Sequence, residues 1–392
     1  MYAIKRELKL NKKQRSLMRG IAGFKRYVYN YCIDLLVASW NFEGVKVGDS
    51  KRIDTIKKVF TQVTMQKPEN AWMKKYPATV YQSAFMEVKD AITRWRKGLG
   101  GFPNKKSKKK GDSFTVYKTF GVYPEKGKPA LPFTNRVTML AGKQVKLPGL
   151  KTFRLKERIK FICSSQTFTV SRAADKWFVS FVLDAEKIPP VIHPVQRAGV
   201  DLGVKCLATV SDGSKYNMPI TIKRAKTKLR LLQWRNRNKV LGNKRLKIRA
   251  SNKAKQYYVS LSCQHLRIAN IRQDATQKMT TSLSRRIYNI RIEDLNVSGM
   301  IANHKLAEAV SNNCFYEIRR QLIYKQTHYG TKVELVDRWY PSSKTCSKCG
   351  HVQDIRLSDR LFNCQQCGHS QDRDENASVN LENAPSHRVR SA

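Results

Sequence analysis

Residues 197–213 read "RAGVDLGVKCLATVSDG", and this stretch decides the fold of the second half of the chain. Its apolar run predicts a strand followed by a hairpin. Alternation along the strand places Val200, Leu202 and Val204 on one side and leaves Asp201 on the other, between Gly199 and Gly203. Asp201 is therefore expected where a bulky ligand could approach the backbone closely.

Further along the chain, "YNIRIEDL" (288–295) and "TKVELVD" (331–337) predict two more strands. In the first of them Tyr288, Ile290 and Ile292 share one side, and Glu293 projects from the other side at the strand end. A very basic helical stretch is predicted over 222–250, followed by a helix with a stripe of apolar residues. That stripe consists of Tyr258, Leu261, Ile268, Ala275 and Met279. The last two hundred residues are therefore expected to form an α/β domain.

A third acid follows in "DRDENASVNLENA" (372–384), which predicts a helix from about Asp374 onward. Taken alone, Asp372 fits the cap of this helix, and Asp374 fits its first turn, where the helix dipole favours a negative charge. Together with Asp201 and Glu293, however, Asp374 completes a set of three carboxylates suited to Mg²⁺ or Mn²⁺. Carboxylates that share two such ions about 4 Å apart can hydrolyse a phosphodiester. No P-loop, Rossmann fingerprint or Ser/His/Asp arrangement competes with this interpretation.

Four cysteines form a second candidate site. Cys346, Cys349, Cys364 and Cys367 are spaced as two C-x2-C pairs, and a glycine follows each pair. Four thiolates favour tetrahedral Zn²⁺ and leave no open position for a reacting water. The pattern predicts a structural zinc, which makes Asp372 and Asp374 unnecessary as its ligands.

The charge of the chain points to a polyanionic partner. Its 392 residues include 76 Lys and Arg against 29 Asp and Glu, a net charge of +47. Such an excess favours nucleic acid over an anionic membrane, because no apolar run is long enough to span a bilayer. The first residues lack a signal peptide, so the cytoplasm or nucleoid of a prokaryote is the expected compartment. The cations expected to contact phosphate are Lys105, Lys106, Lys108, Lys109, Lys110, Arg230, Arg235 and Arg237.

The first half of the chain predicts helices and then strands. Asn11 and Gln14 indicate the start of an amphipathic helix whose outer side includes Lys25 and Arg26. A second helix is expected after Pro77, with Gln82 facing outward. From about residue 113 to 183 the period changes to two, which predicts an antiparallel sheet or small barrel. "KIPPVIHPVQ" (187–196) predicts a linker.

Several motifs together resemble one known family. "GVDLGVK", "RIEDLNVSGM", "VDRWYPSSKTCSKCG" and "CQQCGHSQDRDENASVNLENA" occur in an order and spacing similar to the TnpB (OrfB) proteins of insertion sequences, which are related to compact type V CRISPR effectors. The resemblance extends to "GFKRYVYN" and "YPATVYQSAFMEVKDA" in the first third. One departure is Gln277, where many members carry a histidine before the lysine.

The resemblance implies a multidomain α/β fold with an RNase H-like (RuvC) nuclease domain over 191–392 and a zinc ribbon inserted at 340–370. It also implies a wedge-type β-barrel formed by 1–10 and 112–190 and a helical recognition domain over 11–111. Matched by motif, the catalytic, magnesium-binding acids are Asp201, Glu293 and Asp374. Their neighbours Asp294, Asp337 and Asp372 are expected to have structural or supporting roles.

The activity implied is RNA-guided cleavage of double-stranded DNA beside a short flanking motif. The guide RNA would be transcribed from the end of the transposable element, and Gln82 matches a position that reads the flanking DNA. Base pairing between guide RNA and target DNA would then recognise the sequence, while the basic protein binds the nucleic-acid backbone and recognises the shape of the A-form duplex. Two alternatives remain open: an RNA-independent transposase or resolvase on the same fold, and a non-cleaving zinc-ribbon regulator that binds nucleic acid.

Overall fold

The computed structural model describes most of the chain in two compact units, Met1–Ala185 and Glu186–Ala392. The described residues are all except 1, 42–46, 109–110, 118–136, 141, 148, 160–163, 166, 184–190, 204–205, 243–245, 247, 303–309, 311–313, 357–358 and 392. No helix in this described part is long and apolar enough to cross a membrane.

The first unit contains an eight-stranded sheet in the order β2-β7-β8-β1-β5-β4-β3-β6, and its paired strands are antiparallel. The strands are β1 (Tyr2–Lys9), β2 (Ser113–Val116), β3 (Val137–Leu140), β4 (Gly142–Lys146), β5 (Thr152–Ile159), β6 (Ser164–Ser165), β7 (Phe168–Ala173) and β8 (Lys176–Leu183). The N-terminal strand thus pairs with β8 and β5 in the middle of a sheet built from residues more than a hundred positions later. The antiparallel sheet is confirmed. Within the described residues β2 and β6 are its two ends, so closure into a barrel stays a prediction.

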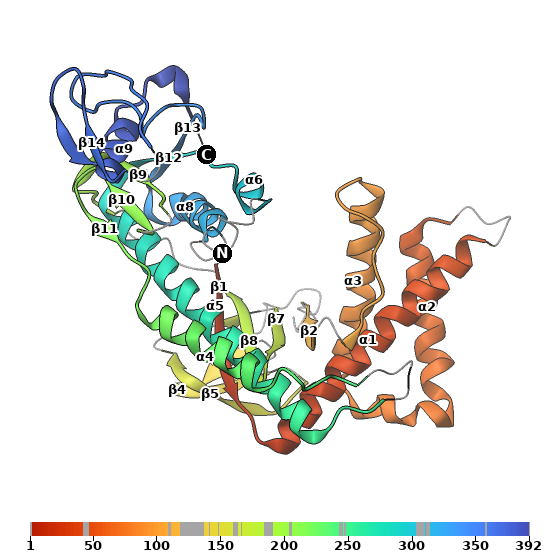
Figure 1. Cartoon of the computed structure of the whole chain (residues 1–392). Helices are drawn as coiled ribbons and strands as arrows, with labels where there is room; N and C mark the ends of the chain where they lie inside the picture. Colours follow the sequence, from red (N-terminus) through yellow and green to blue (C-terminus); the bar gives the residue numbers. More distant parts are fainter. Residues whose placement is uncertain are drawn as a thin grey trace. The chain divides into compact units, whose positions relative to one another are not determined.

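Three long helices complete this unit: α1 (Lys12–Trp40), α2 (Asp49–Gln62) and α3 (Ala78–Arg96) (Figure 1). Two 3₁₀ helices, Thr64–Gln66 and Pro68–Lys75, connect α2 to α3. The predicted start of α1 is confirmed, since Asn11 and Gln14 cap each other's backbone N–H groups. The predicted outward position of Lys25 is wrong: its side chain is 3% exposed and pairs with Glu87 of α3. Arg26 likewise pairs with Asp112, so both cations hold the unit together.

The second unit is built on a six-stranded mixed sheet in the order β11-β10-β9-β12-β13-β16. Its strands are β9 (Val195–Asp201), β10 (Ala208–Val210), β11 (Lys215–Tyr216), β12 (Ile287–Glu293), β13 (Lys332–Val336) and β16 (Val389–Ser391). β9, β10 and β11 form an antiparallel meander, and β12 and β13 continue the sheet parallel to β9. The predicted α/β architecture is confirmed. Ile290 and Ile292 are buried, whereas Tyr288, near the start of β12, is 41% exposed.

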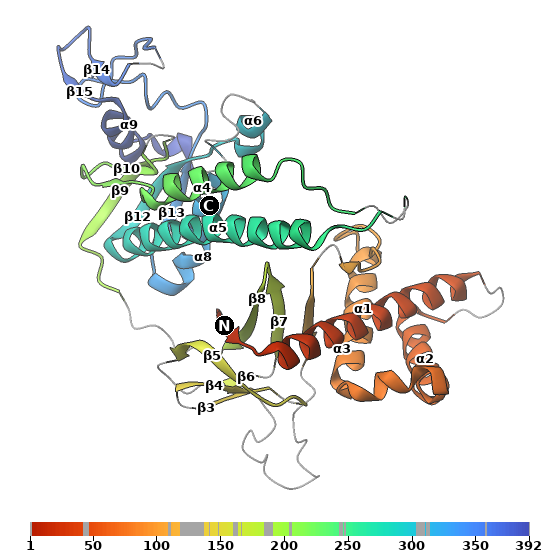
Figure 2. The ribbon, with the colours of Figure 1, turned by 60° about the horizontal axis from the view of Figure 1, so that its bottom comes forward.

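Helices cover this sheet and extend beyond it: α4 (Thr221–Arg235), α5 (Asn252–Arg286), α6 (Val297–Ala302), α8 (Phe315–Tyr329) and α9 (Arg373–Glu382). Figure 2 shows α4 and α5 side by side, and the two helices pack against each other. The basic helix predicted to reach residue 250 ends at Arg235. A Cβ on Gly242 would lie 2.3 Å from the Ile248 carbonyl oxygen, so the backbones of these two residues approach more closely than a side chain at position 242 would allow.

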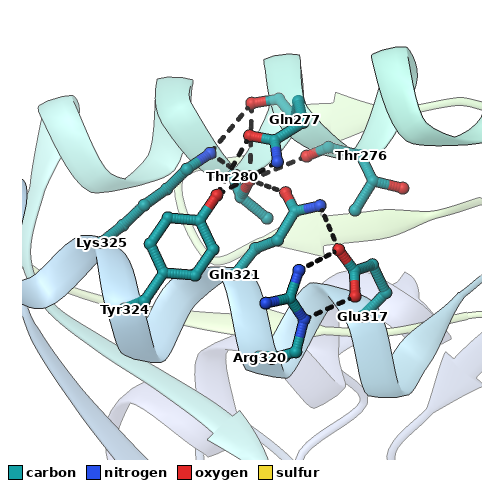
Figure 3. A network of polar contacts seen from close by, with 8 residues as sticks. All are labelled: Thr276, Gln277, Thr280, Glu317, Arg320, Gln321, Tyr324 and Lys325. Carbon is teal, nitrogen blue, oxygen red and sulfur yellow. Dashed lines mark hydrogen bonds and ion pairs between the residues drawn. The ribbon is translucent and has the colours of Figure 1, made fainter. Parts of the chain in front are cut away.

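α5 and α8 are joined by a buried polar network (Figure 3). The ammonium of Lys325 donates to Thr280 Oγ1 at 2.6 Å, to Thr281 Oγ1 at 2.8 Å and to the Gln277 carbonyl at 3.2 Å. Gln277 also donates to the Tyr324 hydroxyl at 3.1 Å. The residue that departs from the family pattern therefore helps to fix α8 on α5.

Candidate active site and metal centre

Asp201 and Glu293 are brought together by neighbouring parallel strands. Val200 of β9 pairs with Ile292 of β12, so the next residues, Asp201 and Glu293, end the two strands side by side. The carboxyl ends of parallel strands meet at one edge of the sheet, where ligands of open α/β sheets commonly bind. Both side chains are partly buried at this edge.

Asp374 reaches the same region from α9. Asp372 caps this helix, its carboxylate accepting from the N–H groups of Asp374 at 3.0 Å and Glu375 at 3.2 Å. The supporting role predicted for Asp372 thus has a clear basis, and the helix begins one residue earlier than expected, at Arg373. Asp374 lies in the first turn, where the helix dipole favours a negative charge.

Gly199 allows α9 to lie directly on β9 (Figure 1). A Cβ at this position would lie 2.0 Å from the Ser378 carbonyl oxygen and 2.5 Å from the Glu382 nitrogen. The glycine beside Asp201 therefore makes room for a helix, not for a ligand as the sequence predicted. This close packing is what brings the helix carrying Asp374 to the strand carrying Asp201.

The acids interact electrostatically in a partly desolvated place. Burial, followed by the charges of Asp374 and Glu293, raises the pKa of Asp201 to about 7. Burial and the charge of Asp294 raise the pKa of Glu293 to about 7. Carboxylates whose charged forms are disfavoured in this way gain from a bound cation.

The three acids do not form a single tight ligand cluster. In the described part of the chain, only the four cysteines form a group of three or more potential metal ligands whose donor atoms all lie within 4.8 Å of one another. Nearby cations hold two of the neighbouring acids: Lys215 pairs with Glu375 at 2.9 Å and with Asp372 at 3.5 Å. Arg373 lies 3.6 Å from Asp374 itself.

The four cysteines converge as their spacing predicted. Cys346 Sγ lies 3.7 Å from Cys367 Sγ, and Cys349 Sγ lies 3.6 Å from Cys364 Sγ. Thiolates around one tetrahedral ion at about 2.3 Å would be about 3.8 Å apart, so the donor set fits such an ion. Each pair ends in a glycine with positive φ, 77° at Gly350 and 69° at Gly368, that closes a tight turn. The short hairpin of β14 (Leu361–Asn363) and β15 (Ser370–Asp372) completes this ribbon.

Two asparagines that the sequence analysis missed fasten the ribbon to α9. Asn376 donates to the Thr345 carbonyl at 2.7 Å and accepts from the Ser347 N–H at 2.9 Å. Asn380, one turn later, donates to the carbonyls of Ser342 and Thr345. The i, i+4 spacing of polar residues on the otherwise buried face of a helix was the available signal. The segment that leads into Cys346 is thereby fixed to the helix that carries Asp374.

The residues predicted to contact nucleic acid belong to both units. Gln82 is partly exposed on α3, while Arg230 and Arg235 are exposed on α4, and Arg237 lies over the Trp234 ring at 5.2 Å. Lys108 is exposed. Lys105 pairs with Asp34 at 2.5 Å, and Lys106 pairs with Glu87 and lies over the Tyr29 ring, so both make contacts within the unit. Lys109 and Lys110 lie outside the described residues.

Two family models match the chain. Residues 180–304 match a family described as "Probable transposase" (OrfB_IS605), and residues 315–381 match "Cas12f1-like, TNB domain". A solved structure described as the Cas12f1-sgRNA-target DNA complex has a similar fold, with a TM-score of 0.57 and 15% sequence identity, covering 95% of this chain and 83% of that chain. These findings define the class, a multidomain α/β protein with the fold of the compact Cas12f1 effectors.

Two curated relatives are more similar in sequence. A protein of Streptomyces pristinaespiralis named "Putative RNA-guided DNA endonuclease" is 28% identical over 362 residues, covering 92% of this chain and 83% of the relative. A protein of Escherichia coli K12 with the same designation and the name InsQ is 29% identical over 398 residues, covering 97% of this chain and 91% of the relative. The predicted resemblance is thereby confirmed, and the chain is a relative of the TnpB (OrfB) proteins.

Proposed function

We propose that this protein is the RNA-guided DNA endonuclease of a transposable element. The observation that carries the proposal is the edge of the second sheet, where Asp201 and Glu293 end neighbouring strands beside the helix of Asp374. In a chain of net charge +47, acids that repel one another in a partly buried place are best explained by bound cations. The names of the relatives supply the substrate, DNA, and the guide, RNA.

Asp201, Glu293 and Asp374 would hold two Mg²⁺ or Mn²⁺ ions. Such a pair supplies a water nucleophile and charge stabilisation for an in-line phosphodiester displacement. The looser spacing of the acids favours two ions over one, because oxygens bound to a single Mg²⁺ are at most about 4.2 Å apart. Lys215 holds the neighbouring carboxylates of Asp372 and Glu375 and so keeps the first turn of α9 in place, while Arg373 lies beside Asp374 itself. The four cysteines would hold a structural Zn²⁺.

The sheet order supports an RNase H-like (RuvC) domain over 191–392, because an antiparallel meander followed by two parallel strands is present. The ribbon at 340–370 would be inserted between β13 and α9. In the first unit, 1–10 and 112–190 would form the wedge-type barrel around a recognition domain of residues 11–111. Gln82 would read the flanking motif, and the exposed cations of α4 would contact phosphate.

The first test is to sequence the RNA that remains bound to the purified protein after a high-salt wash. We expect one species with a constant scaffold and a variable end. Random fragments of cellular RNA would instead support an RNA-independent transposase. The family description "Probable transposase" favours this alternative.

The second test measures cutting of guide-matched duplex DNA in Mg²⁺ by the wild type and by Asp201→Ala. Losing one ligand of the cation site should reduce cutting by a factor of at least about 10³ while leaving RNA binding intact. Equal cutting by both proteins would contradict the assignment of Asp201 to the catalytic site. The cutting would then come from a contaminating nuclease, and the protein itself would be a non-cleaving regulator.

A further inference from the structure

A tryptophan stands almost fully in solvent beside the edge where the acids lie. Trp339, in the turn that follows β13, is 81% exposed. The turn itself is well ordered by hydrogen bonds: the Asp337 carboxylate accepts from the Trp339 N–H at 2.7 Å, and the Asp337 carbonyl accepts from the Tyr340 N–H at 3.0 Å. The indole is therefore held in place by its backbone, while its ring remains available to a partner.

Trp339 lines a cleft of about 300 Å³ together with arginines from two segments. Arg338 comes from the same turn, and Arg388 and Arg390 come from the C-terminal segment that includes β16. The side chains of Arg338, Arg388 and Arg390 are 41%, 46% and 65% exposed, respectively. One aromatic ring and three partly exposed guanidiniums thus share one small concave surface.

A buried acid organises these cations. Asp294, 6% exposed, pairs with Arg390, with Arg319 at 2.6 Å and with Arg338 at 3.2 Å. Burial alone would raise the pKa of Asp294, but hydrogen bonds from Arg338 and Arg319 hold that pKa below its usual value. Asp337 pairs with Arg388 at 3.6 Å. The cleft is lined by three arginines and two acids, so it keeps an excess of positive charge.

The cleft lies at the same sheet edge as the proposed cation site. Asp294 follows Glu293 directly, and Asp337 follows the end of β13, the strand parallel to β12. By alternation Asp294 faces the side of the sheet opposite to Glu293, and it pairs there with Arg319 of α8. The cleft therefore opens at the same strand ends as the acids, on the other face of the sheet. A chain molecule that passes over the ends of these strands would reach both faces.

We propose that the Trp339 cleft binds a single-stranded segment of the nucleic acid being cut, with one base stacked on the indole and the adjoining phosphate held by Arg338, Arg388 and Arg390. An aromatic platform beside guanidiniums is the usual means of holding single strands, because every base offers a π-face and every linkage a negative charge. In a duplex the bases are already stacked on one another. This inference rests on the proposed function, since it assigns the cleft to the substrate of the same edge.

The experiment measures fluorescence anisotropy of labelled strands of about 12 nucleotides, a length within single-strand site sizes, bound to the full-length, salt-washed protein. All variants carry Asp201→Ala to prevent cutting. We expect Trp339→Ala to weaken binding about 5- to 150-fold, the range observed for one base stacked on an aromatic ring. Trp339→Phe should keep most of the affinity, and duplex of the same sequence should bind all variants within about twofold.

Two further variants make the result specific. Tyr316→Ala removes another aromatic residue of the same unit, 67% exposed on α8, and should leave single-strand affinity unchanged. Arg388→Gln should make the slope of log affinity against log salt shallower by about 0.7, the contribution of one phosphate of a single strand. Parallel measurements with DNA and with RNA identify the strand that is preferred, and a loss with either one supports the cleft.

The inference is overturned if Trp339→Ala and Tyr316→Ala behave alike, or if duplex and single strand lose affinity equally. Thermal unfolding of each variant shows whether it has folded. If Trp339→Ala does not fold, Trp339→Phe still tests the stacking. Failure of the proposed function looks different: the wild-type Asp201 protein would not cut guide-matched DNA, whatever the Trp339 variants bind.

Discussion

Single residues in this chain show both what local patterns reveal and where they fail. Alternation along two strands identified Asp201 and Glu293, because the period of a strand directly sets which side a residue faces. The same pattern misassigned Gly199, whose missing side chain accommodates the backbone of α9, 180 residues later in the chain. Lys25 was placed outside for the same reason: helical spacing does not reveal that Glu87 will lie opposite it.

Lys325 gives a prediction about pH at this scale. Burial lowers its pKa to about 8, and its three hydrogen bonds go to uncharged oxygens. In the unfolded chain the pKa is about 10.4, so between pH 8 and 10.4 the unfolded state binds the extra proton. The contribution of Lys325 to stability therefore rises with pH across this window.

The measurement is urea unfolding of the wild type and Lys325→Met at pH 7.5 and at pH 10. The free energy of unfolding of the wild type should increase relative to that of the variant by up to about 3 kcal/mol between these conditions. Lys278→Met, at an exposed position of α5, should show no such dependence. If the difference in the free energy of unfolding between the wild type and Lys325→Met is the same at both pH values, Lys325 is not desolvated.

At the scale of elements, α1, α3, α9 and the strands β9, β12 and β13 were predicted because their signals are local, whereas α2 and α8 were not predicted. The Asn11 and Gln14 pair fixed the start of α1, and the cysteine pairs fixed the two turns of the ribbon. The pairing of β1 between β8 and β5 carries no local signal and was available only through resemblance. The contact between α9 and the ribbon was not predicted, because the partners of Asn376 lie about thirty residues earlier in the chain.

That contact predicts a mechanical link between the cysteine site and Asp374. Asn376→Ala would leave the Ser347 N–H without its partner and would leave the Thr345 carbonyl with the hydrogen bond from Asn380. An orphaned group costs about 1–3 kcal/mol, so we expect a loss of about that size in the free energy of unfolding of the second unit. Hydrogen exchange of residues 342–347 should accelerate while the metal content stays at one ion per chain, because all four cysteines remain.

Asn252→Ala is the matched control, since this asparagine is exposed in the first turn of α5. It should change neither exchange nor cutting. If Asn376→Ala leaves the exchange of residues 342–347 unaltered, the ribbon is held to α9 by other contacts, and the proposed link between metal binding and the position of Asp374 fails.

At the scale of the whole molecule, each unit has a hydrophobic core of its own. Residues such as Phe24, Phe114 and Trp177 belong to the core of the first unit, and Val200, Ile290 and Leu335 to the largest core of the second. The second unit also contains both candidate sites, the acids and the cysteines, complete within Glu186–Ala392. Folding and metal binding should therefore not require the first unit.

We predict that a fragment of residues 186–392 unfolds in one cooperative transition and binds one Zn²⁺ through its cysteines, because a core of this size is large enough to be stable alone. It should lose guide-dependent cutting, since the exposed surfaces proposed to read the flanking DNA lie in the first unit. A fragment of residues 221–392 is the control: it lacks β9, which pairs with both β10 and β12 and contacts α9, and should not unfold cooperatively. Circular dichroism during urea unfolding and metal analysis distinguish the two. If the longer fragment behaves like the shorter one, the two units depend on each other for folding, and the sheet edge that holds the acids is not an autonomous site.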